Sequence, residues 1–94
     1  MNFKKKRTLY FVKKRIFKSE DEYTEVCDSS IITVTLKLVN QLKDCELVDI
    51  QLNGDYLNDT CKIVIKSNKE VFLSFIKDFA NYFSKHIEEI GFSL

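Results

Sequence analysis

Three cysteines and one histidine are the residues of this 94-residue chain that could act as nucleophiles or bind a metal. Together they would supply the four ligands of a structural zinc site. Such sites bring their ligands in close pairs, whereas no two of these residues lie closer than sixteen positions along the chain. We therefore expect no metal site and no bound cofactor. The four residues are Cys27, Cys45, Cys61 and His86.

Nucleophilic catalysis finds little support in the sequence. A catalytic triad or a Cys/His pair would have to use His86, and the apolar spacing around it predicts a position on an apolar helical face. The sequence also contains no Gly-rich phosphate-binding loop. We therefore predict no catalytic residue and expect that the protein is not an enzyme.

The remaining composition bears on location and origin. An odd number of widely spaced cysteines favours reduced thiols, and hence the cytoplasm, over a disulfide framework. No apolar run suits a signal peptide or approaches the roughly 18 residues of a membrane span. Residues with A/T-rich codons are abundant, which predicts an A/T-rich genome such as that of a low-GC bacterium, a phage or a mobile element.

Charge is distributed unevenly along the chain. Eight of the first eighteen residues are basic and none is acidic, whereas residues 19–94 hold seven basic and fourteen acidic side chains. This asymmetry indicates that the basic segment contacts a partner. The predicted partner-binding residues are Lys4, Lys5, Lys6, Arg7, Tyr10, Lys13, Lys14 and Arg15.

Two partner classes fit the basic segment. An acidic protein partner would make the chain a binding or regulatory protein that acts by protein–protein contact. Alternatively, lysines beside Tyr10, Phe11 and Phe17 are typical of a surface that stacks and neutralises RNA or single-stranded DNA. The negatively charged remainder argues against a broad nucleic-acid surface. A solvated edge strand, or internal pairing with the acidic segment 20–28, would explain the basic residues without any partner.

The elements that must position these residues follow from apolar periodicity. Residues 8–17 favour a strand with charge on both faces, and hence at a sheet edge. Residues 31–44 fit both a strand and a helix, and we favour the helix, with Asp28, Ser29 or Ser30 as N-cap. Residues 45–52 and 61–66 predict a hairpin that pairs Ile50 with Ile63 and Val48 with Ile65 across a polar loop, 53–60.

A capping box, Ser67 to Glu70, predicts the start of a long helix that ends at Gly91 as the C′ residue. Its apolar arc is so wide that either the other helix or a second chain must cover it. The second possibility predicts a homodimer. The residues predicted for self-association are Leu73, Ala80, Tyr82 and His86.

These elements predict one α+β domain over residues 1–94, with residues 1–6 forming a disordered basic tail. The expected architecture is a small antiparallel sheet of three to four strands with two helices packed on one face, in the order β-α-β-β-α. The many phenylalanines are expected to fill its core.

Overall fold

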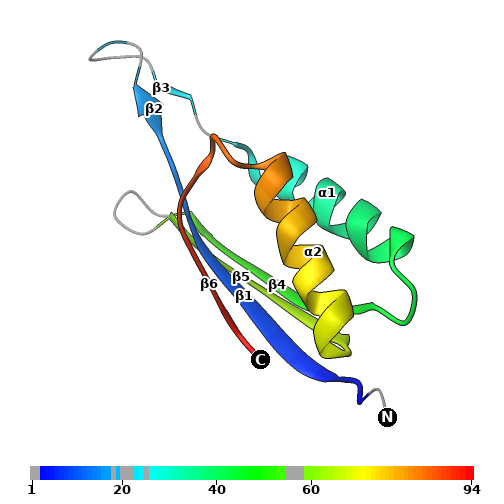
Figure 1. Cartoon of the computed structure of the whole chain (residues 1–94). Helices are drawn as coiled ribbons and strands as arrows, with labels where there is room; N and C mark the ends of the chain where they lie inside the picture. The colour runs from blue at the N-terminus through cyan, green and yellow to red at the C-terminus, as the bar shows by residue number, and fades with distance from the viewer. Residues whose placement is uncertain (1–2, 18, 20–22, 25, 55–58) are drawn as a thin grey trace.

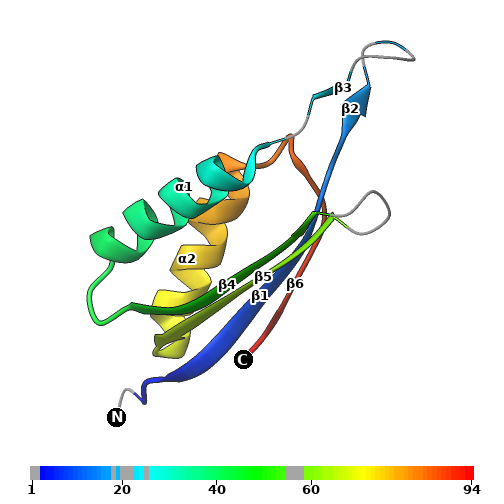
Figure 2. The same ribbon diagram turned by 180° about the vertical axis from the view of Figure 1, so that it is seen from behind.

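The computed structural model describes residues 3–17, 19, 23–24, 26–54 and 59–94. A sheet forms one layer, and two helices cover one of its faces (Figures 1 and 2). This confirms the predicted α+β architecture, to which a further strand is added after the second helix. The elements are β1 (Lys5–Lys13), β2 (Ile16–Phe17), β3 (Tyr23–Thr24), α1 (Asp28–Gln41), β4 (Glu46–Gly54), β5 (Asp59–Ser67), α2 (Lys69–Tyr82) and β6 (Ile87–Ser93).

The four-stranded sheet has the order β4-β5-β1-β6, and each neighbouring pair is antiparallel. Helix α1 connects β1 to β4 across the intervening β5, and α2 connects β5 to β6 across the intervening β1. Two such split β-α-β units make the ferredoxin-like arrangement. Strands β2 and β3 form a separate two-stranded ribbon that projects beyond the sheet (Figure 1).

The core lies between the sheet and the helices. Strand alternation turns Leu9 and Phe11 of β1 toward the helices, together with Ile63 and Ile65 of β5. From α2, an i, i+3, i+7 stripe of phenylalanines meets them, and each of its rings is fully buried. The stripe consists of Phe72, Phe75 and Phe79. An aromatic core is thus confirmed.

The prediction for the C-terminal segment was wrong. Helix α2 ends at Tyr82, and Gly91 lies in β6 rather than at a helix C′ position. The spacing of Ile87 and Ile90 fits a helix, but Ile90 and Phe92 also alternate as in a strand. Pairing with β1 satisfies backbone groups that would otherwise lack partners. For the same reason β1 is a central strand and not the predicted edge.

Both helix starts differ in detail from the predictions. The preferred helical interpretation of residues 31–44 is confirmed by α1 as far as Gln41, where the helix ends, and the N-cap is Cys27 rather than one of the three residues after it. The N-cap of α2 is Asn68, whose side-chain oxygen accepts a hydrogen bond from the Val71 backbone N–H at 2.8 Å. Ser67, the predicted cap, is instead the last residue of β5 and is fully buried.

The β4–β5 hairpin follows the predicted pairing at Ile50 and Ile63. A bulge between Leu47 and Asp49 then places Leu47, not Val48, opposite Ile65. The strands extend to the pair Gly54 and Asp59, so they take up both ends of the predicted loop 53–60; residues 55–58 lie outside the described residues.

The N-terminal segment also departs from the predicted tail. Lys5 and Lys6 belong to β1, where they pair with Ser67 and Lys66, and residues 1–2 lie outside the described residues. Neither α1 nor α2 is long and apolar enough to cross a membrane, and the described residues contain no other α-helix.

Candidate interaction surface

The side chains of strand β1 alternate between the two faces of the sheet. Alternation turns Arg7 and Lys13 toward the helices, where their side chains are only 6% and 5% exposed. Lys6 and Tyr10 lie on the opposite face, which no helix covers (Figure 2). The predicted partner-binding residues therefore do not form one surface.

Arg7 joins three parts of the chain. Its Nε donates a hydrogen bond to the Ser67 carbonyl oxygen at 3.0 Å, and its Nη1 donates to the Leu94 carbonyl oxygen at 3.2 Å. A buried guanidinium needs such acceptors, because desolvation without them is costly. Arg7 thus holds the start of β1 to the end of β5 and to the residue that follows β6.

Three further basic residues form ion pairs. Lys13 Nζ lies 2.9 Å from Asp28 Oδ1 in the first turn of α1, and Arg15 Nε lies 2.7 Å from Asp59 Oδ2 at the start of β5. Both pairs lie where the β2–β3 ribbon leaves the sheet. Lys4 makes a looser pair with Asp44 at 3.7 Å. Internal pairing therefore uses part of the basic segment, as one of the sequence hypotheses supposed: Asp28 belongs to the acidic segment 20–28, whereas Asp44 and Asp59 lie outside it.

The uncovered face of the sheet has Tyr10 at its centre. Its side chain is 45% exposed, and the strand register places Lys62 of β5 on one side of it and Gly91 of β6 on the other. The Lys62 ammonium nitrogen lies 5.8 Å from the centroid of the Tyr10 ring, a cation–π contact that orients both groups.

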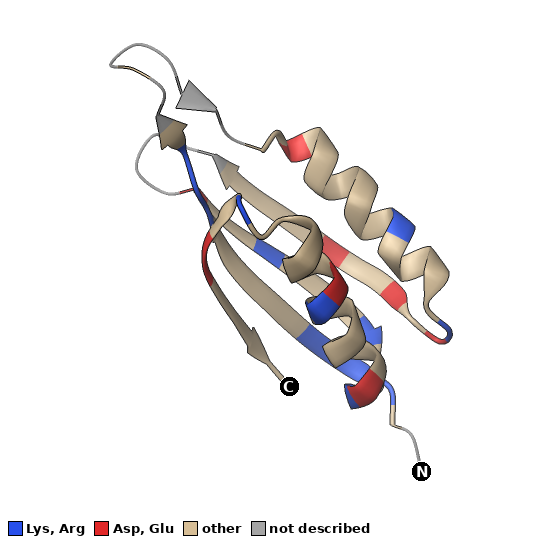
Figure 3. Ribbon diagram, turned by 45° about the horizontal axis from the view of Figure 1, so that its top comes forward, with Lys and Arg blue, Asp and Glu red and all other residues tan. Residues whose placement is uncertain are grey.

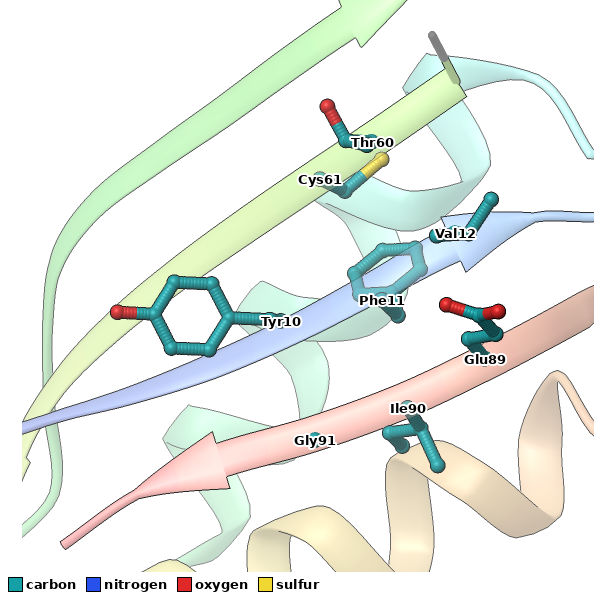
Figure 4. Close-up of a pocket in the computed structure, with 8 residues that line it drawn as sticks. All are labelled: Tyr10, Phe11, Val12, Thr60, Cys61, Glu89, Ile90 and Gly91. Atoms are coloured by element: carbon teal, nitrogen blue, oxygen red, sulfur yellow. The ribbon is translucent and has the colours of Figure 1, made fainter.

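A hollow of about 340 Å³ opens beside Tyr10 (Figure 4). Val12, Thr60 and Glu89 border it on the uncovered face, and Gly91 forms part of its floor. A Cβ atom added to Gly91 would meet no atom within 4 Å, so the space next to residue 91 is open. The residues that line the hollow thus include the aromatic ring of Tyr10 and the carboxylate of Glu89.

Charge on this face follows the strands. The two central strands present Lys6, Lys62 and Lys66 and no acidic residue, because the register aligns these positions on one face. The flanking strands carry acidic residues: Glu46 and Asp49 on β4 and Glu89 on β6 (Figure 3). The result is a basic stripe two strands wide with acidic borders. We call Lys6, Tyr10, Lys62 and Lys66 the basic stripe.

The sequence analysis named Lys6 and Tyr10 but missed Lys62 and Lys66. Alternation within residues 61–66 was the available signal, because it places both lysines opposite the buried face. Of the other predicted residues, Lys5 and Lys14 are exposed.

The residues predicted for self-association do not share one surface with the basic stripe. Leu73 and Tyr82 are exposed on α2, whereas Ala80 is half-buried. Helix α1 packs beside α2, so the first of the two predicted covers for the wide apolar arc is present. A groove remains between the helices, and Val34, Leu38 and Tyr82 are among its lining residues.

His86 lies in the turn between α2 and β6 rather than on a helix. Its backbone N–H donates to the Phe83 carbonyl oxygen, and its own carbonyl oxygen accepts from the Lys14 N–H, both at 2.8 Å. The imidazole is half-buried, and its Nδ1 has no hydrogen-bond partner among the described residues. The backbone of His86 therefore helps to hold the turn against the end of β1.

The three thiols are free and occupy different environments. Hydrogen bonds from the Ser29 and Ser30 hydroxyl groups stabilise the thiolate and lower the pKa of Cys27 to about 7. Burial raises the pKa of Cys61 to about 11 and also raises the pKa of Cys45. Within the described ranges, no three His, Cys, Asp or Glu residues are grouped as metal ligands would be.

Comparisons of this chain with protein-family models, with curated proteins and with solved structures find no match.

Proposed function

We propose that this protein is a small, non-catalytic cytoplasmic binding or regulatory protein that engages an acidic segment of a protein partner. The contact surface is the basic stripe on the uncovered face of the sheet, with Tyr10 at its centre. The observation that carries this proposal is an exposed tyrosine on a central strand, with lysines from two strands aligned around it.

The chemistry of the stripe favours a carboxylate-bearing segment. Lysine ammonium groups pair with carboxylates, and the half-buried Val12 and Val64 beside Tyr10 offer apolar contact. The acidic borders on β4 and β6 limit how far an acidic segment can spread across the sheet. A segment lying along the two central strands therefore fits better than one crossing them.

Single-stranded nucleic acid is the second candidate, and Tyr10 is the observation that favours it. An exposed aromatic ring on a central strand of a four-stranded sheet is the device by which RNA-recognition sheets stack a base. Against it stand the acidic borders, which repel a phosphate backbone that leaves the stripe, and the presence of only one exposed ring among the described residues of this face.

Fluorescence anisotropy with two probes separates these candidates. One probe is a labelled peptide of alternating glutamate and isoleucine, and the other is labelled oligouridine. We expect the peptide to bind more tightly at physiological salt, and we expect the double change Tyr10→Ser and Lys62→Ser to abolish its binding. The control Lys37→Ser removes an exposed lysine from α1, on the far side of the molecule, and should bind as the unchanged protein does.

Three results would count against the first proposal. Tighter binding of oligouridine, with a steep decrease in affinity as salt rises, would establish the nucleic-acid candidate. An equal loss of peptide affinity in the Lys37→Ser control would show that binding depends on the net charge of the protein and not on the basic stripe. If neither probe binds at any accessible concentration, the basic stripe is not a site for acidic polymers.

A further inference from the structure

The strand β6 has an unprotected edge. Among the described residues it pairs with β1 alone, so its other side presents backbone N–H and C=O groups to solvent. Proteins protect such edges with charged side chains (lysine above all), with proline or with bulges in the strand, and the charged residues of β6, Glu88 and Glu89, lie at its start. Residues 90–93 of β6 contain none of these: the one irregularity in its pairing lies at the start of the strand, between Val12 and Lys13 of β1.

Apolar side chains line the same edge. Ile90 and Phe92 point to the helix-covered side, because their partners in β1 are the buried Phe11 and Leu9. They nevertheless remain 43% and 50% exposed, because β6 is the edge strand of the sheet. The Phe92 ring contacts Phe72 edge-on at a centroid distance of 6.2 Å, so the hydrophobic core extends as far as β6, the edge strand.

The sequence of β6 is complementary to itself in an antiparallel pairing. With Gly91 on a two-fold axis, Ile90 lies opposite Phe92 of the second copy on the helix-covered side. Glu89 lies opposite Ser93 of the second copy on the other side. Each apolar exposed residue then gains an apolar cross-strand partner, the contact that stabilises paired strands. The glycines on the axis bring no side chains that could collide.

The charges of β6 select the direction of this pairing. Glu88 and Glu89 are its only charged residues. In the antiparallel register, the two copies of Glu89 are four residues apart along the strands, about 14 Å. That separation exceeds the screening length of about 8 Å at physiological salt. A parallel, in-register pairing would instead place each glutamate directly beside its copy, which is destabilising.

We propose that this chain forms a homodimer through antiparallel pairing of β6 with β6 of a second copy. The two sheets then form one continuous eight-stranded sheet, with all four helices on one side. This interface differs from the surface that the sequence suggested for self-association, which consists of Leu73, Ala80, Tyr82 and His86.

The dimer would place both copies of Tyr10 on the same uncovered face, and the use of this face by a partner rests on the proposed function. Tyr10 is opposite Gly91 in the β1–β6 register, so one row across the dimer reads tyrosine, glycine, glycine, tyrosine. The hollow beside Tyr10 then joins its copy across the axis. The dimer would offer a partner two tyrosines with a floor of two glycines between them.

Sedimentation velocity on the full chain, followed to concentrations of about 200 μM, tests the dimer itself and needs no partner. We expect a species of twice the 11.1 kDa chain mass. The change Gly91→Lys should weaken the dimer by about tenfold or more, because two lysines then face each other across the axis. It should leave the monomer folded, since a side chain at this position enters open space and the backbone φ is not positive.

A charge-exchange experiment identifies the axis directly. Gly91→Lys and Gly91→Asp should each weaken the dimer when alone, and an equal mixture of the two should form a heterodimer. Asn53→Lys, on the opposite edge strand β4, and Tyr82→Lys, on the helix surface, are the controls and should leave the dimer intact.

Each alternative has a distinct result. A chain that stays monomeric at all concentrations overturns the proposal and leaves the β6 edge for a different protein. A dimer weakened by Tyr82→Lys but not by Gly91→Lys is a helix-mediated dimer, which also overturns it. Because none of these outcomes depends on binding of an acidic probe, failure of the dimer and failure of the proposed function are distinguished.

Discussion

Individual residues of the basic segment have different roles that their shared charge conceals. Arg7 and Lys13 are buried and hold elements together, while Lys6 and Tyr10 are presented to solvent. The deciding factor is the strand period of two, which sends neighbours to opposite faces. Replacing a basic residue that faces the helices should therefore lower the stability of the fold, whereas replacing one on the uncovered face should not.

Lys13→Ala should lower the free energy of unfolding by about 1–3 kcal/mol, because it leaves Asp28 without its ion-pair partner and removes a buried side chain. Lys14→Ala, which removes the exposed neighbour, should change it by no more than about 0.5 kcal/mol. Urea denaturation of both variants measures the difference. Equal stabilities would show that the Lys13 pair contributes nothing to folding.

Phe79 contacts three other aromatic rings of the core. Its ring lies 4.9 Å from Phe83, 5.0 Å from Phe11 and 5.8 Å from Phe75, measured between centroids. Phe79→Ala should therefore cost about 3–5 kcal/mol, as large-to-small changes at packed aromatic residues do. Leu73→Ala on the exposed side of α2 is the control, and a loss under about 1 kcal/mol at Phe79 would place that ring outside the core.

Cys27 should be the most reactive thiol at neutral pH. A thiolate is the nucleophile, and the lowered pKa of Cys27 means that about half of it is ionised near pH 7. Its alkylation rate by iodoacetamide should rise with pH and level off above pH 8, while Cys61 stays protected by burial and by its raised pKa. Peptide mapping by mass spectrometry reports both sites. A Cys27 rate still rising steeply at pH 9 would contradict the hydrogen-bonded thiolate.

At the scale of elements, helix starts and strand edges determine how the chain is arranged. Helix α2 begins at Asn68 because that side chain satisfies the Val71 N–H, which the helix itself leaves without an acceptor. The β2–β3 ribbon leaves the sheet where Lys13 and Arg15 are held by their acidic partners. Local contacts thus decide where one element stops and the next begins.

Asn68→Ala should destabilise the protein by about 1 kcal/mol, the usual cost of losing an N-cap. Glu70→Gln tests the capping box that the sequence predicted, and it should have a much smaller effect, because Asn68 and not Ser67 caps the helix. Thermal unfolding followed by circular dichroism compares the two. A larger loss at Glu70 would restore the predicted capping box.

At the scale of the whole molecule, the strand order determines which backbone groups are protected. Strands β1 and β5 are paired on both sides, and the core covers one of their faces. We expect their amides to exchange hydrogen most slowly, at rates set by global unfolding. Hydrogen exchange measured by mass spectrometry should therefore show slower exchange for residues 8–12 than for β4. Fast exchange of 8–12 would instead match the edge strand that the sequence predicted.

The sequence by itself determined those elements whose apolar spacing fits only one kind of secondary structure. The phenylalanine spacing of α2 and the matched faces around Ile50 and Ile63 could each be satisfied in only one way. The β4–β5 hairpin and the α+β class were therefore predictable. Local patterns suffice where the residues that pack together also lie close in sequence.

Only the tertiary structure decided which secondary structure residues 87–93 adopt and on which face of the sheet each lysine lies. Ile87, Ile90 and Phe92 fit both a helical and a strand pattern, and pairing with β1, from the other end of the chain, selects the strand. Arg7 turns inward toward Ser67, sixty residues away in sequence, and Lys62 meets Tyr10 through the sheet register. These outcomes depend on long-range hydrogen bonds and burial, which satisfy groups that no local pattern can pair.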